Sequence, residues 1–137
     1  MADPGSYLLV IKCERSTDIK VGALGKRAFD VGHYAYVGSA FGPGGLSRVD
    51  RHRRIAAGDH DVRHWHIDYL LGAAETELVT VETFPDRDIE CELATALGEA
   101  SCGRIDGFGA SDCDCLSHLW GPAGRPTLRA VADSFRE

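Results

Sequence analysis

The chain has 137 residues, a formal net charge of −6 and 44% hydrophobic residues. This length supports one hydrophobic core, so we treat residues 1–137 as a single globular domain. No apolar run is long enough to span a membrane, and the first residues lack the layout of a signal peptide, which predicts a cytoplasmic protein. The five cysteines are an odd number, which favours free thiols or a metal site over a disulfide framework.

The predicted elements alternate between strands and helices. In chain order they are a strand at Ser6–Cys13, further strands broken by glycine turns within residues 19–38, a helix at Gly45–Ala57, a helix at His64–Leu71, a strand at Glu77–Phe84, a helix from Pro85 to near Gly103, and a short helical tail within residues 121–137.

The segment 33–54 joins an aromatic strand, a glycine-rich turn and an arginine-rich helix. Tyr34 and Tyr36 are two residues apart, so a strand directs both rings to one face. Gly38 is expected to let the backbone turn sharply after this strand. In the helix, a buried stripe is predicted at Leu46, Val49 and Ala56. A neighbouring face is predicted to carry Arg48, Arg51, His52 and Ile55, with Arg48 and His52 projecting together.

Charge along this helix is distributed unevenly, although the whole chain is acidic. Four arginines, Arg48, Arg51, Arg53 and Arg54, stand against the single acid Asp50. Such a strip suits bidentate contacts to phosphate, with Arg51, Arg53 and Arg54 as nucleic-acid contacts. The alternative is a solvated face whose arginines pair with Asp59 and Asp61.

Two short phrases resemble the signature of the GIY-YIG endonucleases: Gly5-Ser6-Tyr7 its first half, and Tyr36-Val37-Gly38 its second. The phrases YVGSAFGPGGL, HWHIDYLL and FGASDCDCLSHL more narrowly resemble the Uri-type branch, small proteins of which some are fused to endonuclease III-like enzymes. The resemblance implies an α/β fold with a small, mainly antiparallel sheet flanked by helices. The residues between the two halves are expected to add an extra β-hairpin.

The same resemblance implies an enzyme that hydrolyses DNA phosphodiester bonds with one Mg²⁺ or Mn²⁺, in DNA repair or processing. Its partners would be DNA and a DNA-repair protein. By resemblance, Tyr7 and Tyr36 lie near the attacking water, where one phenol acts as general base. Arg48 would hold the scissile phosphate, and His52 would assist proton transfer or bind phosphate.

Two carboxylates compete for the metal. Glu90 and Glu92 are two helical positions apart and point in opposite directions, so at most one of them faces the site. Relatives carry apolar residues one and three positions before their metal-binding glutamate. Ile89 and Cys91 give Glu92 this setting, so we choose Glu92 and keep Glu90 as the alternative.

Two clusters outside the signature are accessory candidates. His64 and Asp68, with His66 between them, stand one helical turn apart and can share a metal or pair with each other, or else cap and pack a helix. Cys113, Cys115 and His118 can bind zinc with Cys91 or Cys102, although the spacing of the two cysteines is tighter than is usual; the alternatives are that this segment shapes the wall of the active site and that the two cysteines are buried thiols. A non-catalytic nucleic-acid-binding module and a zinc-stabilised interaction protein are therefore the competing functions.

Overall fold

The computed structural model describes residues 3–41, 45–58, 66–100, 103–105 and 118–135. The strands are β1 Gly5–Cys13, β2 Thr17–Lys20, β3 Lys26–Phe29, β4 Gly32–Ala40, β5 Thr76–Pro85 and β6 Leu119–Ala123. The helices are α1 Arg48–Ala56, α2 His66–Leu71, α3 Glu90–Glu99 and α4 Arg125–Ser134, with short 3-10 turns at Gly22–Leu24 and Gly45–Ser47.

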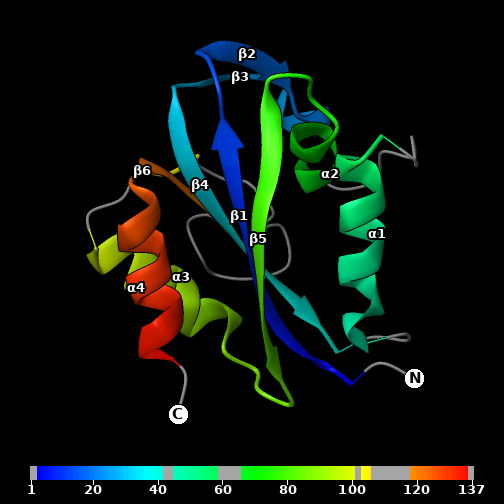
Figure 1. The fold of residues 1–137 in the computed structure, drawn as a ribbon, viewed down its shortest axis with the longest axis vertical. Coiled ribbons are helices and arrows are strands. Elements are labelled where there is room, and N and C mark those ends of the chain that lie inside the picture. Colours follow the sequence, from blue (N-terminus) through cyan, green and yellow to red (C-terminus); the bar gives the residue numbers. More distant parts are fainter. Residues whose placement is uncertain (1–2, 42–44, 59–65, 101–102, 106–117, 136–137) are drawn as a thin grey trace.

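Four strands form the central sheet in the order β5-β1-β4-β6, with every neighbouring pair antiparallel. The predicted α/β class, an antiparallel sheet flanked by helices, is confirmed (Figure 1). The expected extra hairpin is also present: β2 and β3 pair antiparallel as a separate two-stranded sheet at one end of the molecule.

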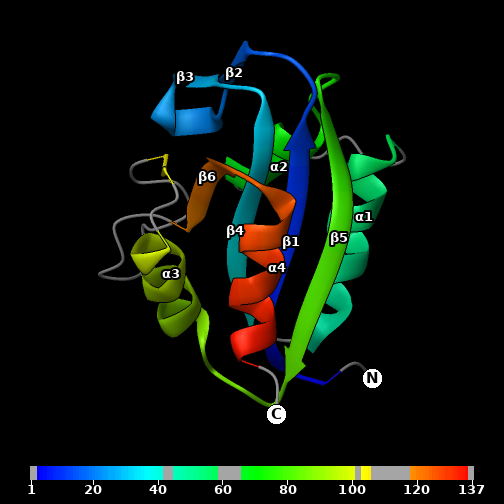
Figure 2. The same cartoon turned by 60° about the vertical axis from the view of Figure 1, so that its left-hand side comes forward.

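The alternation of β1 divides the core into two layers. Tyr7, Leu9 and Ile11 face one side of the sheet and belong to the cluster that includes the buried residues of α1 and α2. Leu8 and Val10 face the other side, where the buried residues of α3 and α4 pack. Figure 2 shows α4 lying over the strands on the face opposite α1. Because each face has its own helices, β1 is almost completely buried.

One element boundary differs from the one expected, and one strand was not expected. Helix α3 begins at Glu90, well after Pro85, which is still part of β5. Helix α2 begins at His66, and residues 64 and 65 lie outside the described residues. Strand β6 was not predicted, because its short sequence contains a glycine and a proline, which usually indicate a turn.

The outer edge of β6 is covered by residues 103–105. The Ile105 amide donates to the Leu119 carbonyl at 3.1 Å, and the Gly121 amide donates to the Gly103 carbonyl at 2.6 Å. The helical tail is confirmed as α4, and it buries Leu128 among other apolar side chains, so it is part of the core.

The position of Gly38 differs from the one predicted. We expected a sharp turn there, but Gly38 lies inside β4, directly opposite Tyr7 of β1. A Cβ atom at position 38 would come within 2.3 Å of Cζ and 2.4 Å of Oη of Tyr7. The glycine therefore makes room for the tyrosine ring.

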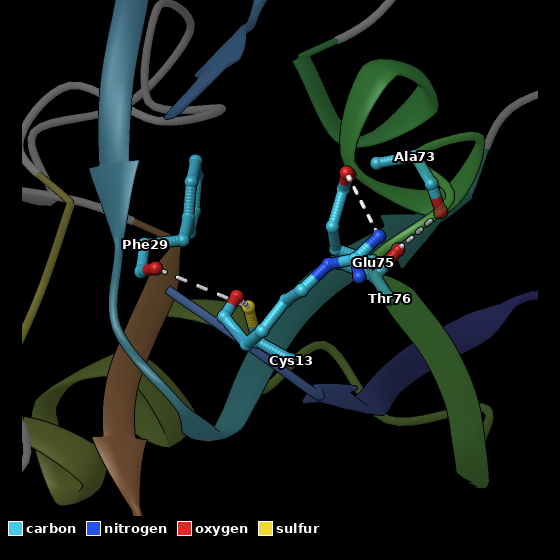
Figure 3. A network of polar contacts seen from close by, with 6 residues as sticks. Cys13, Phe29, Ala73, Glu75 and Thr76 are labelled. Atoms are coloured by element: carbon cyan, nitrogen blue, oxygen red, sulfur yellow. Dashed lines mark hydrogen bonds and ion pairs between the residues drawn. The ribbon is translucent and has the colours of Figure 1, made fainter. Parts of the chain in front are cut away.

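Polar contacts fix the far end of β1, near the hairpin (Figure 3). The Cys13 thiol lies 3.1 Å from the Arg15 carbonyl oxygen and 4.0 Å from that of Phe29, which precedes β4. On the other side, the Thr76 hydroxyl donates to the Ala73 carbonyl at 3.1 Å where β5 begins. Within the described part of the chain, none of the helices combines the length and apolar character that crossing a membrane requires.

Candidate functional site

A buried hydrogen bond joins the first strand to the first helix. The Tyr7 hydroxyl and Nε2 of His52 lie 2.8 Å apart, and both side chains are buried. The ring of Tyr36, from the neighbouring strand β4, stands 6.4 Å from the Tyr7 ring and 6.5 Å from the His52 ring. We call Tyr7, Tyr36 and His52 the tyrosine–histidine group.

Helix α1 places His52 on its buried face. Val49, His52 and Ile55 follow at intervals of three residues and are all buried. The prediction that His52 and Ile55 lie on a face beside the buried stripe is therefore wrong, because the stripe itself passes through them. Leu46 and Ala56, the other two residues predicted for the stripe, are partly buried and pack against its margin.

Arg48 lies one turn before His52 and is half-buried. It donates to the Ser39 carbonyl at 2.6 Å, and its charge and a hydrogen bond act on the Tyr7 side chain. The structure thus brings Arg48 to the tyrosine–histidine group, as the spacing of Arg48 and His52 predicted.

Burial controls the protonation of this group. It raises the pKa of Tyr7 well above its usual range despite the opposing influence of Arg48, and it raises the pKa of Tyr36 in the same way. Burial also lowers the pKa of His52 to about 4, although the negative charge of Asp68 opposes this shift. At neutral pH both phenols are therefore protonated and the imidazole is neutral, with one ring nitrogen able to accept a proton.

Of the two candidate carboxylates on α3, the one that approaches the group belongs to Glu90. Its side chain is 19% exposed, and its negative charge contributes to the raised pKa of both Tyr7 and Tyr36. Glu92 is exposed and lies about 200° farther around α3. The geometry favours Glu90, the alternative choice, over Glu92 as the acid of the site.

Ser6 fixes the start of α3 relative to Tyr7. Its buried hydroxyl donates to the Arg87 carbonyl at 2.8 Å and accepts the Ile89 amide at 3.0 Å. Ile89 is the residue before Glu90, so this side chain satisfies an amide at the beginning of the helix. This role could not be predicted from local sequence, because the partners of Ser6 are more than eighty residues away.

Arg51 and Asp68 join α1 to α2. Two guanidinium nitrogens of Arg51 donate to the two carboxylate oxygens of Asp68 at 2.9 and 2.8 Å, and Asp68 is fully buried. The sequence left open whether Asp68 shares a metal with His64, pairs with it, or caps and packs a helix, and His64 lies outside the described residues. The pairing of Asp68 with Arg51 had no sequence signal, because it depends on how the two helices pack.

The other arginines of the strip face solvent. Arg53 and Arg54 are exposed, and Arg53 reaches Asp50 at 3.5 Å. The proposed partners Asp59 and Asp61 lie outside the described residues. Arg53 and Arg54 therefore form the outward part of the predicted nucleic-acid surface, whereas Arg51 is mostly turned inward.

The remaining accessory residues are only partly described. His66 opens α2 and is half-buried, which lowers its pKa. His118 precedes β6, is 4% exposed, and has its Nδ1 atom 3.8 Å from Oε2 of Glu90. Burial also lowers the pKa of His118. Cys113, Cys115 and Cys102 lie outside the described residues, and Cys91 is exposed on α3.

The donor set at Glu90 fits a divalent cation that keeps much of its hydration. A single carboxylate, completed by waters and a substrate oxygen, is a typical setting for Mg²⁺ or Mn²⁺. Among the described residues, no three histidines, cysteines or acids gather in a way that could hold a metal ion.

Comparison with known proteins identifies a family. Neither the curated proteins nor the solved structures gave a match. A family model described as a domain of unknown function, DUF123, matches residues 6–137 and so covers the sheet, all four helices and the tyrosine–histidine group. The chain belongs to the DUF123 family.

Proposed function

We propose that this protein is a metal-dependent endonuclease of the GIY-YIG type, which hydrolyses phosphodiester bonds in DNA. The observation that carries the proposal is the 2.8 Å contact between the Tyr7 hydroxyl and Nε2 of the neutral His52. A phenol coupled to a proton acceptor, beside an arginine and across from a carboxylate, supplies the groups that phosphodiester hydrolysis requires.

The tyrosine and the histidine act together as the base in this proposal. A free Tyr7 phenolate is unfavourable at neutral pH, because burial raises the pKa of this phenol. Transfer of the phenolic proton to Nε2 of His52, while the phenol oxygen takes a proton from the attacking water, avoids that intermediate. The buried hydrogen bond aligns the two side chains for this transfer.

Arg48 and Glu90 supply the charges. Arg48 would hold the scissile phosphate and stabilise the negative charge that develops in the transition state. Glu90 would hold the divalent cation, which when bound polarises the phosphate and stabilises the leaving oxygen. The exposed Arg53 and Arg54 would contact the DNA backbone away from the scissile bond.

Cleavage of end-labelled DNA tests the proposal. The substrates are a duplex, a nick, a flap and a single strand, each incubated with Mg²⁺, with Mn²⁺ and with chelator. We expect metal-dependent cutting by the wild-type protein and a loss of roughly a hundredfold to a thousandfold in rate for Arg48→Ala, since one electrostatic donor to the transition state is removed.

Arg54→Ala is the matched control, because Arg54 lies on the same helix and is exposed. It should weaken DNA binding only slightly and leave the rate at saturating protein unchanged. Equal cutting by wild type and Arg48→Ala would refute the mechanism. Salt-dependent DNA binding with no product on any substrate would replace the enzyme by a non-catalytic binding module.

A further inference from the structure

We infer that Glu90 and His118 together form a two-ligand site for a first-row transition-metal ion, with Mn²⁺ preferred to Mg²⁺. The inference deepens the proposed function and rests on it for the location of the cation, but it adds a second protein ligand and a metal preference.

The separation of the two side chains is the first observation. Nδ1 of His118 and Oε2 of Glu90 are 3.8 Å apart, which is too long for a direct hydrogen bond. Metal–nitrogen and metal–oxygen bonds at such sites are about 2.0–2.2 Å long, so two ligands of one ion stand at most about 4.4 Å apart. The observed separation is within this limit, so one ion can be bound by both atoms.

The fold holds both ligands in place from different elements. The His118 carbonyl accepts the Val37 amide at 2.9 Å, and the next residue, Leu119, pairs with Tyr36. Glu90 is fixed through Ser6, which accepts the amide of the preceding residue. Both anchors are on strands of the central sheet, which positions the ligands before an ion binds.

The preference for Mn²⁺ over Mg²⁺ follows from the chemical types of the two ligands. An imidazole nitrogen favours transition metals, whereas Mg²⁺ prefers carboxylates and water. The His118 side chain is 5% exposed, so it is a pre-placed ligand with little freedom to turn away. A carboxylate and an imidazole leave several coordination positions of an ion such as Mn²⁺ for water and a phosphate oxygen.

Metal titration without DNA tests the inference independently of cleavage. Calorimetric titrations with MnCl₂ and MgCl₂ would be run on wild type, His118→Gln and Glu90→Gln, after circular dichroism has verified folding. We expect Mn²⁺ to bind wild type at least about tenfold more tightly than Mg²⁺, and each variant to lose roughly 10- to 100-fold in Mn²⁺ affinity. His66→Gln and Glu92→Gln are matched controls that should keep wild-type affinity.

A spectroscopic measurement identifies the ligand directly and covers the case in which His118→Gln does not fold. Pulsed electron paramagnetic resonance of the Mn²⁺-loaded wild type should show coupling to a directly bound nitrogen, which His66→Gln should retain and His118→Asn should lose. No nitrogen coupling, no Mn²⁺ binding by wild type, or unchanged affinity in a folded His118 variant would each overturn the inference. If the protein still cuts DNA when one of these results is found, the metal inference is wrong but the proposed nuclease activity stands. If Mn²⁺ binds through His118 but no DNA is cut, the metal inference stands and the proposed nuclease activity is wrong.

Discussion

The buried environment of His52 is far from that of an exposed histidine. His52 lies inside an aromatic cluster, and its folded-state pKa of about 4 lies below the value of about 6.5 expected for an exposed histidine. Between these two values the unfolded chain binds a proton at this position and the folded chain does not. The contribution of the neutral His52 to the free energy of unfolding is therefore complete above pH 6.5 and is lost as the pH falls toward 4.

A pH series of unfolding measurements tests this assignment. From pH 7 to pH 4.5, His52 alone should remove about 2 to 3 kcal/mol from the free energy of unfolding. A His52→Gln variant keeps a polar group near Tyr7 but does not titrate, so urea unfolding should show a smaller loss in this variant by about that amount. Equal losses in the two proteins would show that the folded-state pKa of His52 is not lowered.

Gly38 carries a second prediction at this scale. A Gly38→Ala change forces the Tyr7 ring away, because the new Cβ would overlap Cζ and Oη. Overpacking of this kind costs about 1 to 3 kcal/mol, and it would also break the contact with His52. The midpoint temperature of thermal unfolding and the rate of DNA cleavage should both fall. Gly124→Ala is the control, since its Cβ would make only an ordinary contact of 3.7 Å with Pro126 and should change little.

At the scale of elements, the contact between α1 and α2 depends on a buried ion pair. Removing the carboxylate in Asp68→Ala takes from Arg51 its bidentate partner in a largely buried position. Breaking such a pair costs about 3 to 5 kcal/mol, whereas replacing both members with apolar residues can be close to neutral. The double variant Arg51→Met/Asp68→Leu should therefore recover most of the stability lost in Asp68→Ala.

The surface pair of Arg53 and Asp50 is the control for that measurement. It joins two exposed side chains on the same helix at 3.5 Å, so Asp50→Ala should cost at most about 1 kcal/mol in urea unfolding. If Asp68→Ala cost as little as Asp50→Ala, the buried pair would not hold the two helices together.

The elements also show how far the sequence allowed prediction. A weakly alternating run rich in β-forming residues identified β1, and glycines at 22 and 25, both with positive φ, marked the turn between β2 and β3. The glycine at 38 was misread, because a glycine signals either a turn or a close approach and the local sequence does not distinguish them. Glu92 was chosen from its neighbours in sequence, but which side of α3 faces the sheet depends on where the helix begins.

At the scale of the whole molecule, the candidate site draws on both layers of the core. Tyr7, His52 and Arg48 belong to the layer of α1, and Glu90 belongs to a helix on the opposite face of the sheet. Ser6, next to Tyr7, is the polar link between them. This joining of layers was not predictable from short sequence patterns, because it is set by tertiary packing.

Loss of the Ser6 hydrogen bonds should change the metal concentration that cleavage requires more than it changes the stability of the fold. Ser6→Ala removes two hydrogen bonds and leaves the Ile89 amide without its acceptor, at a cost of about 1 to 3 kcal/mol. With Glu90 less well positioned, the metal concentration needed for half-maximal cleavage should rise about tenfold, with little change in the rate at saturating metal. Ser134→Ala, which removes a hydroxyl that bonds within α4, is the control. An unchanged metal requirement in folded Ser6→Ala would contradict the assigned role.

The edges of the central sheet also bear on how copies of the chain meet. Residues 103–105 cover the outer edge of β6, whereas β5 is a ten-residue edge strand that pairs only with β1 among the described strands. Such an edge can recruit a strand from another molecule, and charged side chains oppose this. Glu77 and Glu82 interrupt an otherwise uncharged run of threonine, valine and leucine, so two β5 strands brought together would carry like charges. Glu77 and Glu82 therefore oppose self-association through the β5 edge.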